Sequence, residues 1–352
     1  MAIDDRVRDL YNRARSSPAA RPSIVHFAPD RLISEPVRQS EILPRRDYFS
    51  VTVNELFLSH QRKWFTKYDP MVCTVVEFEH DSQSRAVPFL VGPQLIRGAM
   101  TDVPAEGVVF ADTTVAGPHP AKGERLVVTT LLCQIEMHDY VRGLLKGIER
   151  VAGAADVAGL VGPAVRIAES VLDGVDDVLG SGSTQLLAGL RHEFRLTNAV
   201  PSPSYWALIA DPEVDPALLW VRAGRLVHGD SADTVKPYRG SDFTLMCLRA
   251  SPTRLDVDQL PFHSIWQQAK REAARSVDKD TWERRGRAAL FTLAEAIYDS
   301  PDLTIGQQDA LIADYEERAI VLRDEARRRA HLGPGELAAI DARPGSSRIL
   351  EL

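Results

Sequence analysis

The spacing of apolar side chains changes along the chain, and this change is what most constrains the fold. Up to residue 249, most segments rich in Val, Thr and aromatic residues alternate apolar and polar positions, as in residues 49–57. A period of two is typical of half-buried β-strands. From residue 265 onward, apolar residues recur every three or four positions, which is typical of amphipathic helices. Strands followed by a run of helices predict an α+β fold rather than alternating βα units.

The expected strands share an enrichment in β-branched and aromatic residues. They span residues 49–57, 71–78, 86–91, 108–115, 125–135, 205–210, 218–227 and 243–249. Helices are expected at residues 265–275 and 282–297, and after Thr304, which forms a capping-box pattern with Gln307. Residues 138–185 interrupt the strands with helical spacing and many small side chains. We therefore expect a mainly antiparallel β-sheet or sandwich with a helical insertion at 138–185 and a C-terminal helical bundle.

Four segments follow from this interpretation: an N-terminal helix and Pro-rich arm (1–47), a β-rich core (48–262), the C-terminal helices (263–333) and a tail (334–352). Residues 16–46 contain five prolines and little periodicity. They predict an extended arm that lies on the body or on a partner and is not a core element.

The stretch FADTTVAGPHPAKGERLVVTT, residues 110–130, places glycines, prolines, His119 and Lys122 between two strand-like runs. A phosphate-binding P-loop needs Gly-Lys-Ser/Thr and a following helix. Here Lys122 precedes the glycine, Glu124 stands where the hydroxyl is needed, and a strand follows. The P-loop is excluded. Residues 116–124 instead predict a tolerant hairpin connection in which His119 is exposed.

Composition argues against several classes of ligand. A formal charge of −7 and a pI of about 5.8 disfavour nucleic acid, because phosphate binding needs a basic face. The most lipid-like stretch, 151–179, is interrupted by charged residues, so no membrane-spanning helix is expected. The first residues are charged and lack an apolar run, which predicts no secretory leader. With only seven lysines among 42 basic residues, the composition indicates a bacterial protein, and we expect it to be cytoplasmic.

Catalytic and cofactor motifs are not recognisable in the sequence. Cys73, Cys133 and Cys247 each share a strand face with apolar residues, so all three are interpreted as unreactive core thiols. The GSGST stretch at 180–184 follows a helical segment and predicts a linker rather than a nucleophile elbow. The sequence lacks His-Glu-x-x-His, paired Cys-x-x-Cys, an EF-hand loop and Gly-x-Gly-x-x-Gly after a strand. We therefore expect no metal, no dinucleotide and no other cofactor.

Two charged stretches could belong to a binding site. LRHEFRL (190–196) sets His192 and Glu193 between basic residues, and RKWFTKYDP (62–70) mixes cations with aromatic side chains. Such mixtures can stack nucleic-acid bases. Arginine stems also cover aromatic rings on ordinary protein surfaces. In an acidic chain we interpret both stretches as surface.

The sequence as a whole predicts a non-catalytic protein-interaction or scaffold component of a bacterial multi-protein system. One alternative is a hydrolase whose site is assembled from distant residues, for which Glu136, His138, Asp139 and His192 are the candidates. A second alternative is a membrane-active effector that uses the 151–179 helix, although the polar side of that helix is acidic rather than basic.

The protein partner is expected to bind the N-terminal arm and the last helix. The apolar line of that helix is expected to pack against the stripe at 282–297. Its residues are Leu311, Tyr315, Ala319 and Leu322. This packing would leave Ile312 and Ile320 exposed for the partner.

Overall fold

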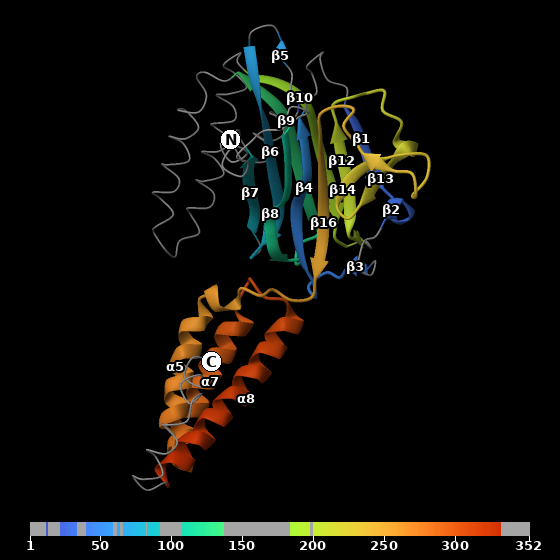
Figure 1. Ribbon diagram of the computed structural model, residues 1–352. Helices are drawn as coiled ribbons and strands as arrows, with labels where there is room; N and C mark the ends of the chain where they lie inside the picture. Colours follow the sequence, from blue (N-terminus) through green and yellow to red (C-terminus); the bar gives the residue numbers. More distant parts are fainter. Residues whose placement is uncertain are drawn as a thin grey trace, which may run out of the picture. The chain divides into compact units, whose positions relative to one another are not determined.

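The computed structural model (Figure 1) describes residues 12, 22–33, 40–58, 62–63, 66–81, 83–91, 108–136, 184–197 and 200–331. The chain divides into two compact units, Met1–Ser251 and Pro252–Leu352. In the described residues, the first unit is built mainly of strands and the second of helices (Figure 1). The predicted α+β class, with a predominance of antiparallel sheet, is confirmed.

The strands of the first unit follow one another with short 3-10 turns between some of them. They are β1 (Ser23–Phe27), β2 (Leu32–Ile33), β3 (Ser40–Ile42), β4 (Tyr48–Leu58), β5 (Arg62–Lys63), β6 (Thr66–His80), β7 (Gln83–Val91), β8 (Val108–Pro120), β9 (Arg125–Glu136), β10 (Thr184–Arg195), β11 (Val200–Ser202), β12 (Ser204–Ile209), β13 (Leu219–Arg222), β14 (Arg225–His228), β15 (Lys236–Pro237) and β16 (Phe243–Ser251). The 3-10 turns are η1 (Pro29–Arg31) and η2 (Pro216–Leu218).

These strands form a central sheet, an outer sheet and a small sheet. The central sheet has the order β1-β12-β16-β4-β8, and the outer sheet has the order β10-β9-β6, with β5 and β7 both pairing with β6. All of these pairs are antiparallel. The small sheet has the order β15-β14-β13-β2, and β3 pairs separately with β11.

The central sheet is the middle layer, and both of its faces are apolar. On β16, Met246 and Leu248 pack toward the outer sheet, while Leu245 and Cys247 pack toward the small sheet. On β12, Trp206 faces the outer sheet in the same way. A strand buried on both faces loses the apolar–polar alternation, which explains unbroken runs such as SYWALI.

The link between β8 and β9 is not a hairpin, contrary to the sequence-based expectation. β8 pairs with β4 in the central sheet, whereas β9 pairs with β6 and β10 in the outer sheet, so residues 121–124 cross from one sheet to the other. His119 is half-buried, and its ring stacks on Phe78 at a centroid distance of 4.4 Å. Prolines and glycines indicated a turn, but here they belong to an irregular strand end that packs against the outer sheet.

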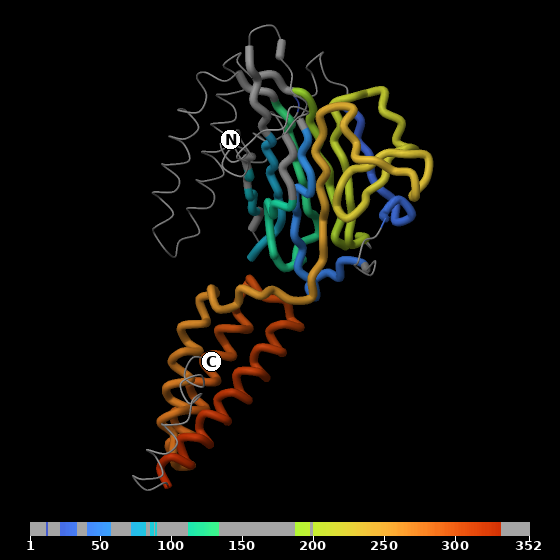
Figure 2. Tube along the Cα trace, viewed as in Figure 1, coloured from blue at the N-terminus to red at the C-terminus, as the bar shows by residue number. Residues whose placement is uncertain are grey.

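The arm is also part of the body rather than an appendage, which corrects a second expectation. β1 pairs with β12 at the edge of the central sheet, as Figure 2 shows for the blue trace beside the yellow one. Val25 and Phe27 of β1 are buried, and Ile42 of β3 lies in the core between the two large sheets. Prolines flank these short strands without interrupting them, so proline content alone was misleading.

The described part of the second unit, residues 252–331, contains three main helices. They are α5 (Phe262–Arg275), α7 (Arg287–Tyr298) and α8 (Ile305–Ala330), with the short elements η3 (Val257–Gln259), α6 (Lys279–Thr281) and the π-turn η4 (Trp282–Gly286). Their shared core includes Trp266 and Tyr315, whose rings stack at 4.4 Å. Gly286 is required in the π-turn, because a Cβ atom there would lie 2.2 Å from the Trp282 ring.

The sequence predicted where α8 begins, and it correctly predicted one of the two isoleucines that it expected to be exposed. Thr304 caps the helix by accepting a hydrogen bond from the Gln307 amide at 3.4 Å. The Gln307 side chain accepts a hydrogen bond from the Arg254 amide at 3.0 Å and donates one to the Arg254 carbonyl oxygen at 2.8 Å. It therefore ties the start of α8 to a distant part of the chain. Ile320 is exposed as expected, whereas Ile312 packs against the core of the unit. No described helix is long and apolar enough to cross a membrane.

Residues 137–183, which hold nearly all of the expected insertion at 138–185, lie outside the described residues, and β10 begins at Thr184. Of the GSGST stretch, only Thr184 is described, and it is the first residue of β10.

Candidate functional site

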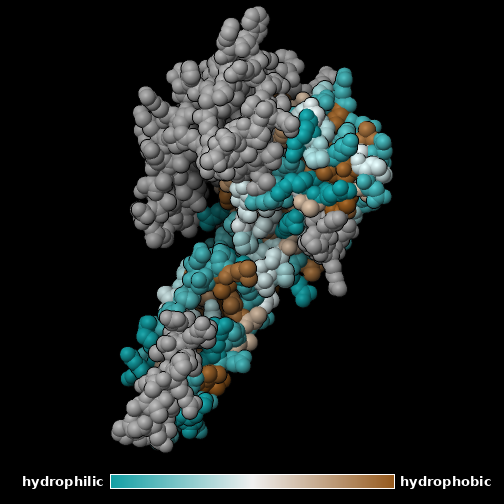
Figure 3. Space-filling model, viewed as in Figure 1, coloured by the Kyte–Doolittle hydropathy of each residue, from teal (hydrophilic) through white to brown (hydrophobic). Residues whose placement is uncertain are grey.

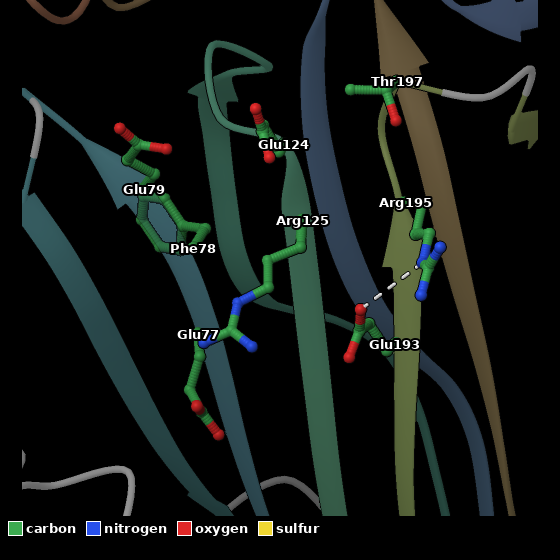
Figure 4. Close-up of a pocket in the computed structure, with 8 residues that line it drawn as sticks. All are labelled: Glu77, Phe78, Glu79, Glu124, Arg125, Glu193, Arg195 and Thr197. Atoms are coloured by element: carbon green, nitrogen blue, oxygen red, sulfur yellow. Dashed lines mark ion pairs between the residues drawn. The ribbon is translucent and has the colours of Figure 1, made fainter.

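A cavity of about 510 Å³ opens at one end of the outer sheet (Figure 4). It collects side chains from the end of β6, the start of β9 and the end of β10. They are Glu77, Phe78, Glu79, Glu124, Arg125, Glu193, Arg195 and Thr197. Six of these eight residues are charged, so the cavity is a polar site.

Strand alternation explains why the charged side chains gather there. On β10, Phe194 packs into the core between the sheets, which sends Glu193 and Arg195 to the opposite face. On β9, Leu126 packs into the same core and Arg125 lies outward. Because Arg195 is paired in register with Arg125, these two outward positions are neighbours across the strands.

Glu77 is the most buried of the charged residues that line the cavity. Its carboxylate accepts hydrogen bonds from both terminal nitrogens of Arg191, at 2.5 Å and 3.3 Å, and its side chain is 7% exposed. Arg191 also donates to the Thr129 hydroxyl at 3.2 Å. A buried carboxylate with a two-point partner of this kind has a fixed position.

The rim of the cavity is more open. Glu193 and Arg195 form an ion pair at 3.8 Å, drawn as a dashed line in Figure 4, and the Arg195 side chain is 74% exposed. A surface pair at this distance contributes little to stability, so both groups can exchange partners at low cost. Gly123 lets the crossing segment approach β6, because a Cβ atom there would lie 2.6 Å from the Cβ of Glu79.

The lining residues can form electrostatic contacts with a ligand. Among the described residues that line the cavity, none is Cys, His or Ser. Within the described part of the chain, no group of three or more His, Cys, Asp or Glu residues could hold a metal ion. Carboxylates and guanidinium groups can form salt bridges and charge-assisted hydrogen bonds with a ligand that carries both signs of charge.

The three cysteines are buried and free, as the sequence predicted. Burial raises the pKa of the Cys73 thiol to about 12. Burial, with a smaller contribution from Cys73, also raises the pKa of Cys133. Because the thiolate is the nucleophilic form, neither group is suited to catalysis at neutral pH.

The four hydrolase candidates are not brought together in the described residues. His192 lies on β10 and its ring contacts that of Phe194, on the core side of the sheet, so it points away from the cavity that its neighbour Glu193 lines. Burial, and secondly the charge of His26, lower the pKa of His192 to about 4. Glu136 ends β9 at the opposite end from Arg125, while His138 and Asp139 lie outside the described residues.

The second charged stretch, 62–70, forms β5 and the start of β6, where Arg62 pairs in register with Lys67. It lies on the same strand as Glu77 and Glu79 but at the other end. The stretch therefore contributes no residue to the lining of the cavity.

Sequence reasoning singled out Glu193 but interpreted it as surface, and it did not propose any of the charged lining residues as a site. The usable signal was in EFEHD and KGERL, where charged residues occupy the ends of expected strands. Such residues look like ordinary solvated strand ends until the pairing of β6, β9 and β10 brings them side by side.

A second polar cluster joins the central sheet to the small sheet. The buried carboxylate of Glu55 accepts a hydrogen bond from the Leu226 amide at 2.8 Å and forms an ion pair with Arg239 at 3.0 Å. Arg225 binds the Asn54 carbonyl oxygen at 2.7 Å and pairs with Asp112, and this pairing lowers the pKa of Asp112. These contacts join β4 and β8 of the central sheet to β14 and to the segment that follows β15, so we interpret the cluster as structural.

In comparisons with known proteins, no family model, no curated protein and no solved structure matches this chain.

Proposed function

We propose that the protein is a non-catalytic protein-interaction or scaffold component that recognises a charged segment of a protein partner in the cavity of the outer sheet. The observation that carries this proposal is the composition of the cavity, whose described lining residues present carboxylates and guanidinium groups of both signs of charge. The deep Glu77–Arg191 pair holds the site in place, and the exposed groups around it supply contacts.

The charges of the lining favour a peptide over nucleic acid. Four glutamates and two arginines line the cavity, and Arg191 neutralises one of the glutamates. Phosphate groups would be repelled by the remaining carboxylates. A peptide that carries a lysine or arginine next to an acidic residue can satisfy Glu124 and Glu193 together with Arg195. Complementary charges of this kind give an interface its specificity and its association rate.

The helical unit supplies a separate surface that supports protein binding. Phe291 and Tyr298 of α7 are 66% and 56% exposed, and Ile320 of α8 is 44% exposed. Figure 3 shows hydrophobic patches among hydrophilic residues on these helices. Large exposed apolar side chains are enriched where proteins meet.

A groove of about 390 Å³ lies between α5 and α7, and Glu272 and Arg285 are among its lining residues. The Oε2 atom of Glu272 is buried there without a hydrogen-bond partner. A donor from a bound partner would satisfy this atom.

In this proposal the last helix still contacts the partner, as expected from the sequence, but fewer residues of the N-terminal arm do. Because β1 and β3 are integrated into sheets, the described residues of the arm offer a partner exposed positions such as Ile24 and Leu43. We also propose the finer features expected from the sequence: a helical insertion at 138–185, a C-terminal helical bundle, and a bacterial cytoplasmic location. The membrane-active alternative rests on residues 151–179, which lie outside the described residues.

A hydrolase remains the second candidate, because the cavity gathers carboxylates from distant parts of the chain, and paired carboxylates are used in general acid–base catalysis. Glu193→Gln separates the two functions. It removes an acid–base group while keeping its shape, so a hydrolase would lose turnover while binding of its ligand persisted.

The test is site-specific photo-crosslinking in cells that produce the protein naturally. A photoreactive residue replaces Thr197, which lines the cavity, or Lys236, an exposed residue on β15. We expect a discrete protein adduct from position 197 and none of the same mass from position 236. If the folded protein gives no protein adduct from position 197, the cavity is not a protein-binding site.

A further inference from the structure

Two histidines meet where the edges of the two large sheets face each other. His26 lies on β1, the first strand of the central sheet, and His192 lies on β10, the first strand of the outer sheet. Their ring centroids are 4.5 Å apart, with the ring planes tilted by 40°. This side-chain contact bridges the two layers at one edge of the sandwich.

The surroundings of the pair are aromatic and apolar. The His192 ring contacts Phe194 at 4.2 Å and Trp206 at 6.1 Å. Trp206 is buried, and its Nε1 atom has no hydrogen-bond partner. His192 is half-buried and His26 is more exposed, so water reaches the pair from the β1 side.

Among the described residues, no opposite charge compensates a positive charge on this pair. The other described side chains on these faces of β1, β10 and β12 carry no charge, and they include Ile24, Leu190, Phe194, Ser204, Trp206 and Leu208. The charged neighbours on β10, Arg191 and Glu193, point to the opposite face of the outer sheet. Among the described residues, His26 is therefore the only charged group that acts appreciably on His192.

We propose that the His26–His192 contact is an acid-sensitive latch that holds β1 against the outer sheet when both rings are neutral and releases it when they become protonated. Two adjacent cations repel each other, and each also gains hydration by moving apart. Among the described strands, β1 has one hydrogen-bonded neighbour, β12, and only five residues. Short edge strands of this kind open more readily than central ones.

The direction of the pH effect follows from the same contacts. Burial lowers the pKa of both histidines relative to the usual 6.5, to about 4 for His192. The unfolded or open form therefore binds protons more tightly than the closed form. The latch is fully closed above pH 6.5 and loses stability as the pH falls from 6.5 toward 4.

Amide hydrogen exchange of residues 23–27 in the full-length protein tests the latch. Protection factors, corrected for the intrinsic pH dependence of exchange, are compared at pH 7 and pH 5. In the wild type we expect at least a threefold loss of protection at pH 5 in β1, and a smaller loss in β16 at the centre of the same sheet. His192→Phe, which keeps an aromatic ring without a charge, should remove most of this difference, as should His26→Gln.

His228→Gln is the matched control, because His228 is exposed on β14 and belongs to the small sheet. It should leave the acid-dependent loss in β1 unchanged. The latch is ruled out if wild-type β1 is equally protected at both pH values, or if His192→Phe and His26→Gln both retain the wild-type loss. Titration of the His192 ring by NMR gives an independent check. A midpoint near 6.5 that His26→Gln does not shift would also overturn the proposal.

Discussion

Arg191 donates two hydrogen bonds to the carboxylate of Glu77, at 2.5 Å and 3.3 Å, and so joins β10 to β6 across the intervening strand β9. Replacing Arg191 by Met removes the two-point cationic partner of a buried carboxylate, and we expect a loss of about 3 kcal/mol in the free energy of unfolding. Arg195→Met on the same strand is the control. Its pair with Glu193 is long and exposed, so it should change stability by less than about 0.5 kcal/mol. Urea denaturation of both variants measures the difference, and equal losses would contradict this role for Arg191.

Gly117 should be intolerant of substitution, in contrast to the tolerant turn that the sequence predicted. Its φ is +103°, and a Cβ atom would lie 2.5 Å from the carbonyl oxygen of Phe49. Gly117→Ala is therefore expected to lower the free energy of unfolding by about 1–3 kcal/mol. Ala223 adopts a φ of +48° in the β13–β14 hairpin, and glycine fits this conformation without strain. Ala223→Gly should leave the thermal midpoint unchanged or raise it, and an equal drop for both variants would refute the argument.

The cysteines should react slowly in the native protein. Cys73, Cys133 and Cys247 are buried, and burial holds the pKa of Cys73 at about 12. In denaturant, a thiol reagent should modify all three cysteines. In the same time at neutral pH, it should modify on average fewer than one cysteine per native chain. Rapid stoichiometric labelling of Cys133 in the folded protein would be inconsistent with the buried position of this residue.

Removal of the N-terminal arm should destabilise the β unit. Deleting residues 1–46 removes β1, with its buried Phe27, and β3, with its buried Ile42. We expect the truncated protein to lose the cooperative thermal transition of the β unit. Phe27→Ala alone should cost about 3 kcal/mol, as large-to-small changes in a core do. A truncated protein that melts cooperatively at the wild-type temperature would show that β1 and β3 are dispensable.

The elements of this fold were more predictable than their partners. The alternation in residues 49–57 located β4, and the spacing after residue 282 located α7, because burial of one face leaves a local pattern. The pattern does not show which strands pair. β8 and β9 look like a hairpin in sequence, yet they belong to different sheets, and only the core around Phe78 and His119 explains why.

Of the candidate site, the sequence singled out Glu193 but interpreted it as surface. A charged residue at a strand end has the same local signature whether it faces solvent or a cavity. The difference depends on register, which places Arg195 opposite Arg125 and sends His192 to the other face. A one-residue change of register would reverse these directions, so no motif in the sequence could encode the site by itself.

The central claim is that the charged cavity binds a protein partner, and the yield of the position-197 adduct tests it most directly. The yield is measured in the wild-type background, in Glu124→Lys with Glu193→Lys, and in Glu41→Lys with Glu213→Lys, an equal charge change at exposed sites of the same unit. Reversing the cavity charges should reduce the yield at least about tenfold, equivalent to roughly 1.4 kcal/mol of binding free energy, while the control pair leaves it near wild type. An undiminished adduct after reversal in the cavity, or an equal loss in the control, would contradict recognition by these side chains.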